Sequence, residues 1–246
     1  MKFRLLLFFA VLSLGVYSQN DFPYGKIKVR SFTQKDYSAN AQNWDMIQND
    51  DHFLYFANNG GILEYNGETW NKVELNTTPR SFAKSDSGRI YVGARNEFGY
   101  IDYNDLGKTI YVKISEPVDS LQFEDVWQVY CLGEHTYFVA GTHVFIYFNE
   151  KLEVIDVPEG ARIKRSVCID QTLICTFEFD EVSEDKSFVL RGDKFIEISN
   201  SQAVTPIELF IQNEKKYIID NQGFFHEFQQ NGNYYQFVKL TDKALN

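Results

Sequence analysis

The chain has 246 residues, a formal net charge of −10 at pH 7 and an aromatic share of 16%. This acidic balance argues against nucleic acid or an anionic membrane surface as a partner, because both attract basic proteins. The aromatic share favours pleated, half-buried strands, and with only 5 prolines in the chain no proline-rich linker divides it.

The N-terminus has the pattern of an export signal. Lys2 and Arg4 precede an apolar stretch over residues 5–16, and Val16 and Ser18 are the small residues of a cleavage site. The apolar stretch is shorter than the roughly 20 residues that a membrane-spanning helix needs. We therefore predict a signal peptide over 1–18 and an exported protein, periplasmic or extracellular, with an uncleaved membrane anchor as the alternative.

The first clear structural unit combines three strands and two turns. Trp44–Gln48 and Phe53–Ala57 predict strands joined by a polar turn over residues 49–52, and Ile62–Tyr65 predicts the next strand. Asn66-Gly67 follows, which is the dipeptide that a tight hairpin turn with positive φ favours. The pattern predicts consecutive antiparallel strands.

This pattern recurs along the chain. Apolar strand centres align at steps of 36, 47, 37 and 43 residues, at Phe56, Val92, Val139, Thr176 and Ile219. A period near 40 residues with about four strands per unit is typical of propeller blades. We predict an all-β fold for residues 19–246, a β-propeller whose five four-stranded blades lie at about 41–76, 79–115, 124–158, 163–199 and 205–240.

Two stretches resemble a known family. Tyr55–Gly67, between Trp44 and Trp70, and Gly88–Tyr100 resemble blades of the two-component-regulator propeller family. The resemblance covers residues 41–103, while later units share only the period and the aromatic pattern. It implies an extracytoplasmic, ligand-sensing propeller of bacterial hybrid sensors or transcriptional regulators. In that family a triple-Tyr domain, a membrane helix and an output domain often follow.

Ile27–Phe32, ahead of the first unit, has the pattern of a short strand. In propellers an N-terminal strand of this kind commonly completes the last blade and closes the ring. The fifth unit already has a predicted outer strand at Tyr235–Lys239, so that Ile27–Phe32 has no blade to join. We therefore expect a partial or truncated ring, with a closed five-bladed ring as the alternative.

The residue types that serve catalysis or metal binding are scattered. Cys131, Cys168 and Cys175 lie in apolar runs and are expected to be buried thiols, although Cys168 and Cys175 could pair across a hairpin. The histidines lie in different hairpins; they are His52, His135, His143 and His226. The acidic residues near 178–185 lack the order of a calcium loop. No catalytic motif occurs. We expect no enzyme, no cofactor and no metal.

Propellers usually bind ligands where the loops before the inner strands and those between the second and third strands converge on the axis. Amides, guanidinium groups and tryptophan rings there suit a sugar, since rings stack on its faces and planar polar groups take its hydroxyls. The alternative for Trp44 and Trp127 is packing between blades. The candidate ligand-binding residues are Asn43, Trp44, Asn58, Asn59, Arg80, Arg95, Asn96, Glu97, Trp127, His143, Arg165, Asn221 and Gln222.

The sequence thus favours a sensing module of a bacterial receptor that binds a small molecule or oligosaccharide and passes the signal to domains outside this sequence. A secreted propeller hydrolase or lyase acting on polysaccharide is one alternative. A protein-interaction scaffold is another, and differs from the sensor only in the ligand.

Overall fold

The computed structural model describes residues 29–180, 182–201 and 204–240, without the side chains of residues 169 and 182–184. The chain forms two units, Met1–Phe32 and Thr33–Asn246. The predicted signal peptide, 1–18, and the first two residues of the predicted strand Ile27–Phe32 lie outside the described residues. Residues 29–32 form no strand, so that prediction is wrong for the part described. Val29 is 78% exposed, and no strand pairs with the segment to hold it in a ladder.

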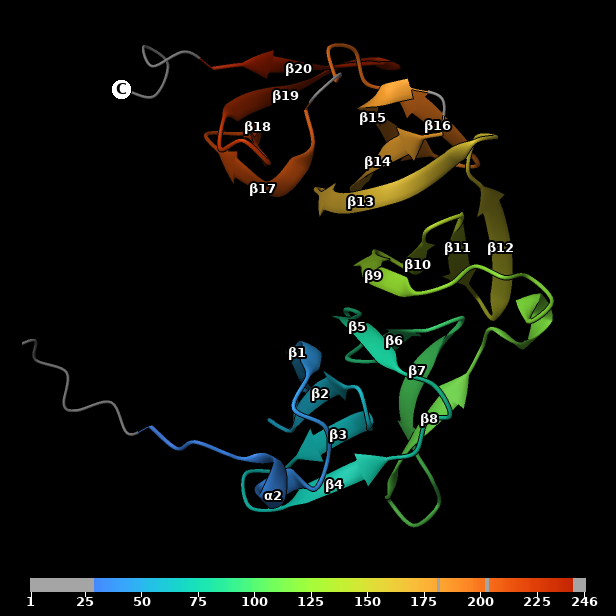
Figure 1. Cartoon of the computed structure of the whole chain (residues 1–246), viewed down its shortest axis with the longest axis vertical. Coiled ribbons are helices and arrows are strands. Elements are labelled where there is room, and N and C mark those ends of the chain that lie inside the picture. Colours follow the sequence, from blue (N-terminus) through green and yellow to red (C-terminus); the bar gives the residue numbers. More distant parts are fainter. Residues whose placement is uncertain (1–28, 181, 202–203, 241–246) are drawn as a thin grey trace, which may run out of the picture. The chain divides into compact units, whose positions relative to one another are not determined.

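Thr33–Asn246 confirms the predicted fold class, because it contains five four-stranded antiparallel sheets, each with its strands in chain order (Figure 1). We call these sheets blades 1 to 5. Blade 1 contains β1 (Asn43–Gln48), β2 (Leu54–Asn58), β3 (Gly61–Tyr65) and β4 (Trp70–Val73). Blade 2 contains β5 (Pro79–Lys84), β6 (Ile90–Ala94), β7 (Glu97–Tyr103) and β8 (Thr109–Lys113). Blade 3 contains β9 (Val126–Leu132), β10 (His135–Ala140), β11 (His143–Phe148) and β12 (Lys151–Asp156).

The last two blades follow the same scheme. Blade 4 contains β13 (Ala161–Ile169), β14 (Thr172–Phe179), β15 (Val182–Arg191) and β16 (Lys194–Glu197). Blade 5 contains β17 (Pro206–Gln212), β18 (Lys215–Asp220), β19 (Phe225–Asn231) and β20 (Tyr234–Lys239). The first strand of each blade is its inner strand.

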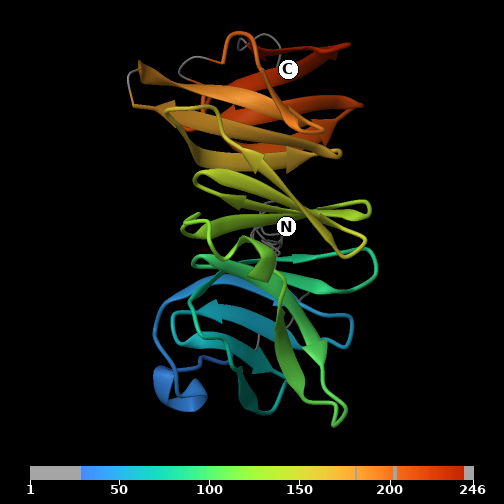
Figure 2. The same cartoon turned by 90° about the vertical axis from the view of Figure 1, so that its right-hand side faces the viewer.

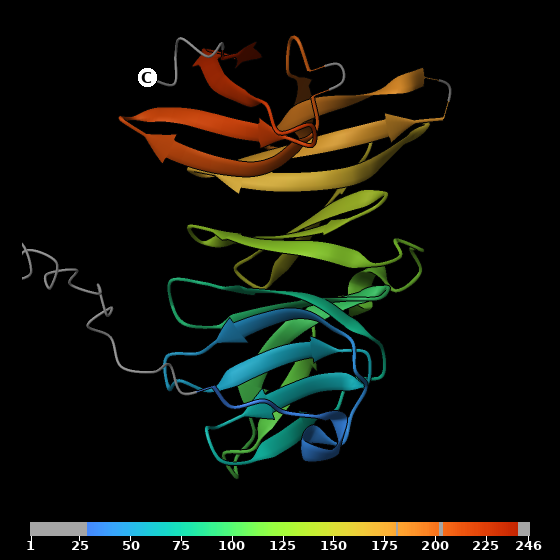
Figure 3. The ribbon, with the colours of Figure 1, turned by 60° about the vertical axis from the view of Figure 1, so that its left-hand side comes forward.

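Two short helical turns accompany the strands. Helix α2 (Gln34–Tyr37) lies beside blade 1, as Figure 3 shows. Its capping box joins Thr33 and Asp36, and the ring of Tyr37 lies 5.4 Å from that of Trp70. A 3-10 turn, η1 (Glu116–Val118), follows blade 2. Sequence periodicity did not predict α2, because four residues are too few to show a helical repeat.

Each blade buries its apolar faces against its neighbours in the chain. One apolar cluster lies at each of the four junctions between consecutive blades, and Figure 2 shows consecutive sheets stacked face to face. Tyr55 of blade 1 and Phe82 of blade 2 share one cluster. Phe98 of blade 2 stacks on Phe138 of blade 3 with ring centroids 4.3 Å apart. A single blade has no core of its own, and stacking therefore provides the stability.

Two glycines are required by local geometry. Gly67 has a φ of 97°, which confirms the positive φ predicted for the hairpin turn. Gly93 lies at the junction of blades 2 and 3, where a Cβ atom would come within 2.7 Å of the carbonyl oxygen of Val126. The inner strand of blade 3 therefore lies directly against the backbone of blade 2.

Candidate functional site

The inner strands share a β-bulge at one position. Near the start of each inner strand the ladder to the second strand shifts register, and unpaired residues interrupt it. A bulge leaves a residue outside the ladder and re-aims its side chain. The bulged residues, which we call the bulge row, are Trp44 (with Asp45), Arg80, Trp127, Lys164 and Ile207.

Three members of the bulge row form a stack across blades 1 to 3. The guanidinium carbon of Arg80 lies 4.6 Å from the ring centroid of Trp44 and 4.9 Å from that of Trp127. The two indole rings are 5.5 Å apart at an angle of 70°. Trp44 is 43% exposed and Trp127 45% exposed. We call this group the Trp–Arg–Trp stack; its side chains contact one another across blades 1 to 3, and both tryptophans are also partly exposed.

Arg80 is the buried centre of the stack. Its side chain is 12% exposed, and its Nε donates to Oδ1 of Asp125 at 3.0 Å. Its Nη1 is buried and has no hydrogen-bond partner among the described residues. A buried donor without a partner is costly, so an acceptor oxygen from a ligand or a water would be stabilised there.

Two small hollows adjoin the stack. One, of about 210 Å³, is lined by Trp44, Asp45, Arg80, Ser81, Trp127 and Gln128. The second, of about 190 Å³, is lined by Trp127, Gln128, Val139, Ala140, Ile163, Lys164, Arg165 and Ser166. Because Trp127 and Gln128 line both, the hollows are neighbours and run along the bulge row from blade 1 to blade 4.

Polar contacts between blades hold the walls of these hollows in place. The two carboxylate oxygens of Asp45 accept the backbone N–H groups of Phe82 and Met46, each at 2.7 Å. Burial raises the pKa of Asp45, and those two hydrogen bonds partly offset the rise. Ser81 donates its hydroxyl to the carbonyl oxygen of Val126 at 3.0 Å. Each side chain therefore ties its blade to the next.

The predicted residues of blade 1 divide between the stack and its support. Trp44 donates its indole N–H to Oδ1 of Asn59 at 2.7 Å, so that Asn59 belongs to the site. Asn58 is fully buried. Its amide donates to the carbonyl oxygen of Asn40 at 2.6 Å and to Oδ1 of Asn43 at 2.8 Å. Asn58 and Asn43 thus stabilise the segment that leads into Trp44.

Four other predicted residues line neither hollow. The exposed Arg95 forms a backbone bridge to Asp125. Asn96, at a φ of 52°, accepts the backbone N–H of Phe123 at 3.0 Å. Glu97 lies 3.6 Å from Nζ of Lys113 within its own blade. His143 was predicted to face the axis. Its ring lies 3.3 Å from Asp156 of the outer strand β12, because the two residues are directly paired across β11 and β12.

The remaining predicted residues come from blades 4 and 5. Arg165 lines the second hollow together with Trp127. Asn221 and Gln222 are exposed in the β18–β19 loop. The backbone N–H of Asn221 donates to the carbonyl oxygen of Thr205, and that of Gln222 donates to the carboxylate of Asp220. The structure thus brings together five of the predicted residues, namely Trp44, Asn59, Arg80, Trp127 and Arg165.

Sequence reasoning missed five polar residues that line the hollows, namely Asp45, Ser81, Gln128, Lys164 and Ser166. Asp45 and Lys164 lie in a bulge, and Ser81 and Gln128 directly follow one. A prediction that included the third residue of each of the first three inner strands would have found Asp45, Ser81 and Gln128. The bulge itself leaves no signal in an apolar–polar pattern.

The three cysteines, Cys131, Cys168 and Cys175, are free thiols, and Cys175 is buried. Burial raises the pKa of Cys131 and Cys168 to about 11, so both are protonated at neutral pH. Within residues 29–180, 182–201 and 204–240 no group of three His, Cys, Asp or Glu side chains could hold a metal. The same residues contain no helix long and apolar enough to cross a bilayer.

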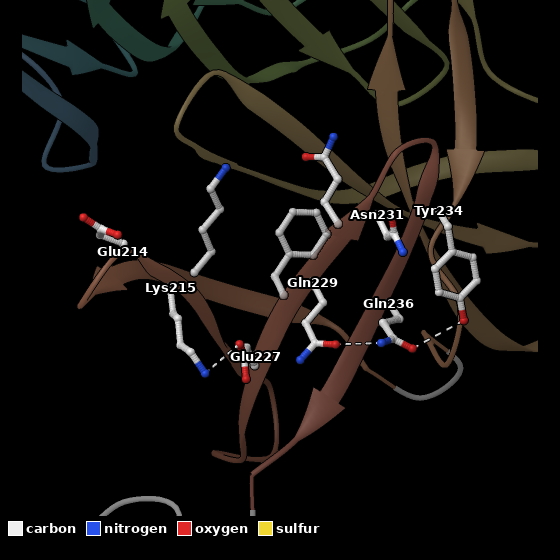
Figure 4. Close-up of a pocket in the computed structure, with 10 residues that line it drawn as sticks. Glu214, Lys215, Glu227, Gln229, Asn231, Tyr234 and Gln236 are labelled. Atoms are coloured by element: carbon white, nitrogen blue, oxygen red, sulfur yellow. Dashed lines mark hydrogen bonds and ion pairs between the residues drawn. The ribbon is translucent and has the colours of Figure 1, made fainter.

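A further hollow, of about 530 Å³, lies on blade 5 along β18, β19 and β20. Figure 4 shows that several of its polar side chains contact one another. Lys215 pairs with Glu227 at 3.1 Å, and Gln236 donates its amide to Gln229 at 2.7 Å. Tyr234 in this hollow is 51% exposed, but among the described residues that line it no buried side-chain donor lacks a partner, unlike Arg80 of the Trp–Arg–Trp stack.

Comparison with known proteins gives structural likeness alone. No protein-family model and no curated protein match the chain. Among solved structures, virginiamycin B lyase of Staphylococcus aureus is similar at 13% identity and a TM-score of 0.52, over 81% of this chain and 69% of the lyase.

Two extracellular domains from B. thetaiotaomicron are also similar. That of the hybrid two-component system BT3049 has 12% identity and a TM-score of 0.55, over 89% of this chain and 30% of that one. That of the one-component system BT4673 has 17% identity and a TM-score of 0.54, over 81% and 33%. The chain thus spans about a third of each domain. At these identities the similarities show the propeller-type fold and no shared activity.

Proposed function

We propose that the chain is an exported, ligand-sensing propeller module of a bacterial signal-transduction receptor, and that its ligand binds at the Trp–Arg–Trp stack. The observation that carries the proposal is the stack itself: two half-exposed indole rings hold a buried guanidinium whose Nη1 has no partner among the described residues. Exposed tryptophans on a rigid scaffold are more typical of a binding site than of a core.

An oligosaccharide fits this chemistry. Sugar rings stack on indole faces, while Gln128, Asn59 and the guanidinium of Arg80 offer planar groups for hydroxyl or ring oxygens. The hollows follow the bulge row across four blades, which suits an extended chain of sugars better than a compact metabolite.

Signalling is the proposed output. The likeness to the BT3049 and BT4673 extracellular domains and the predicted signal peptide over 1–18 support an extracytoplasmic location. Downstream signalling domains, outside this sequence, are the proposed partners. Binding across blades 1 to 4 would couple occupancy to the junctions between those blades, since all four blades contribute residues to the walls of the hollows.

The hydrolase or lyase alternative gains less support from the site. General acid–base catalysis needs a titratable group with a free face toward the substrate. Asp45 is the one carboxylate among the residues that line the two hollows, and both its oxygens already accept backbone N–H groups. This arrangement favours binding over bond cleavage.

The proposal is tested with a glycan array probed by residues 19–246 and by two variants. We expect the wild type to bind a restricted set of oligosaccharides and Trp127→Ala to weaken that binding about tenfold or more, because a stacked ring is lost. Ile207→Ala, which alters an exposed bulge-row residue outside the hollows, is the matched control. Equal binding by all three proteins would contradict the proposed site, and unfolding of Trp127→Ala would restore the packing interpretation of that residue.

A further inference from the structure

The outward face of blade 5 repeats a face that is covered elsewhere in the molecule. Tyr217 pairs with Glu227 across β18 and β19, as Tyr55 pairs with Glu64 across β2 and β3. In each blade the second-strand residue paired with the start of the inner strand serves as a reference point; it is Asp220 in blade 5 and Asn58 in blade 1. Each tyrosine lies three residues before that reference point. The two tyrosine–glutamate pairs therefore occupy equivalent positions.

In blade 1 this face is buried by blade 2. Tyr55 is fully buried and Glu64 is 5% exposed. The hydroxyl of Thr109, on the outermost strand of blade 2, donates to Glu64, and the hydroxyl of Tyr103 lies 3.4 Å from that of Tyr55. A buried carboxylate is stable here because a donor from the next blade meets it.

In blade 5 the same face is aromatic and only half-buried. The ring of Phe210 lies 5.3 Å from that of Tyr217 and 6.0 Å from that of Phe225. Strand residues that face blade 4, such as Phe228 and Phe237, are at most 4% exposed, whereas Tyr217, Phe225 and Glu227 on the other side are intermediate. Glu227 turns to Lys215 of its own blade (Figure 4). The described part of the chain contains no sheet after blade 5.

Blade 1 of a second copy is a poor occupant of this face. Trp70 in blade 1 corresponds to Tyr111 in blade 2, since each pairs with the equivalent third-strand residue. The position of Thr109 therefore falls in the turn before β4, which begins only at Trp70, so that blade 1 has no strand residue there to donate to Glu227. Tyr37 of α2 also lies against Trp70 on this side of blade 1.

We propose that the outward face of blade 5, formed by Phe210, Tyr217, Phe225 and Glu227, docks a blade-type β-sheet of a partner β-domain. The partner sheet presents apolar side chains to the three rings, as Phe82 does at Tyr55. Its outermost strand carries a hydroxyl that donates to Glu227, as Thr109 does to Glu64. Docking replaces the contact between Glu227 and Lys215.

The test uses the full chain with a copy of residues 79–115 appended after Asn246, because blade 2 is the sheet that covers the equivalent face. Residues 241–246 then separate Leu240 from the copy, while residues 74–78 separate Val73 from Pro79. We expect the extended chain to melt about 4 °C or more above the natural chain. Glu227→Gln should lower the melting temperature of the extended chain and leave that of the natural chain unchanged.

Two matched variants assign the effect. Lys215→Met removes the present partner of Glu227 and should leave the gain in melting temperature intact. Thr→Val at the appended copy of Thr109 should reduce the gain as much as Glu227→Gln does, with no further loss when both changes are combined. An unchanged melting temperature, with the appended copy digested by protease as an unfolded tail, would overturn the proposal.

Sedimentation of the natural chain tests the competing occupant. We expect a monomer at micromolar concentration. A dimer that Tyr217→Arg dissociates would make a second copy the occupant and would overturn the proposed partner sheet.

Discussion

The loop ends of blades 1–3 and of blade 5 use the same backbone device with different side chains. The bulge presents two tryptophans and Arg80 in blades 1–3, and Ile207 in blade 5. In blade 5 the adjacent loop is closed on itself. Asp220 accepts the backbone N–H groups of Gln222 and Phe224, each at 2.9 Å, and lies 2.9 Å from the ring nitrogen of His226.

The loop of blade 5 is built for stability, whereas the stack of blades 1–3 keeps groups available for binding. The polar groups of the blade 5 loop satisfy one another, and the side chains of Asp220 and His226 are at most 5% exposed. The stack in blades 1–3 leaves indole surface and one guanidinium nitrogen unused by the described residues. We infer that the bulge provides placement in every blade, and that the side chain at the bulge decides where a ligand can bind.

The largest expected loss of stability comes from a substitution that opens the closed loop of blade 5. Asp220→Ala should lower the free energy of unfolding by about 3 kcal/mol, because it strands a buried imidazole and two backbone N–H groups. Asp156→Ala is the matched control: Asp156 also pairs with a histidine, His143, but its side chain is 84% exposed. That loss should stay below about 1 kcal/mol. Urea denaturation measures both, and equal losses would remove the contrast.

The same loop predicts a pH dependence. Burial alone would raise the pKa of Asp220, but hydrogen bonds from Phe224, His226 and Gln222 hold it below its usual value. A lowered pKa in the folded state gives stability that is present above the unfolded value, about 4, and is lost as the pH falls through the folded value. The melting temperatures of the wild type and Asp220→Asn should therefore differ at pH 6 and converge below about pH 4. A constant difference would contradict this sign.

The next effect concerns the junction that supports the stack. Gly93→Ala should cost about 1–3 kcal/mol, because the added methyl group meets the Ser81 hydroxyl and the Val126 backbone. The equivalent position in blade 4 is the buried Thr176, which hydrogen-bonds Ser187. Thr176→Ala should cost about 1 kcal/mol through the lost hydrogen bond. Chemical denaturation that ranks the two variants the other way would show that blade 3 does not lie tightly on blade 2.

The smallest stability effect lies in the stack. Arg80→Met should cost about 1 kcal/mol, because it removes the contacts of the guanidinium with two rings and with Asp125. It should also change tryptophan emission, since the cation lies over Trp44 and Trp127. Ile207→Met, at the bulge of blade 5 and outside both hollows, should leave the emission unchanged. Identical spectra for all three proteins would contradict the stack.

Much of the fold could be predicted from the sequence because each blade repeats a local signal. Alternating apolar residues predict which strand face is buried, and Gly67 marks a turn that requires a positive φ. The helix α2 and the residues 29–32 were not predictable in this way. A single helical turn has no period, and an extended segment becomes a strand only if another strand pairs with it.

The candidate site was predictable only in part, since loop position identifies a face but not the direction of each side chain. Trp44, Arg80 and Trp127 were found because each lies beside the first residue of its inner strand. His143 and Glu97 begin third strands at the same end, yet turn to Asp156 and Lys113 of their own blades. The bulges re-aim only the inner-strand residues, and they depend on the register between the first two strands, which the sequence alone does not reveal.

The most direct measurement follows the indole N–H signals of the three tryptophans by NMR while an oligosaccharide that binds on the array is added. Trp70, whose ring stacks on Tyr65 in blade 1, serves as the internal control. We predict that the signals of Trp44 and Trp127 shift in a saturable way and that the signal of Trp70 stays in place. Binding that shifts neither Trp44 nor Trp127 would contradict a ligand site at the Trp–Arg–Trp stack.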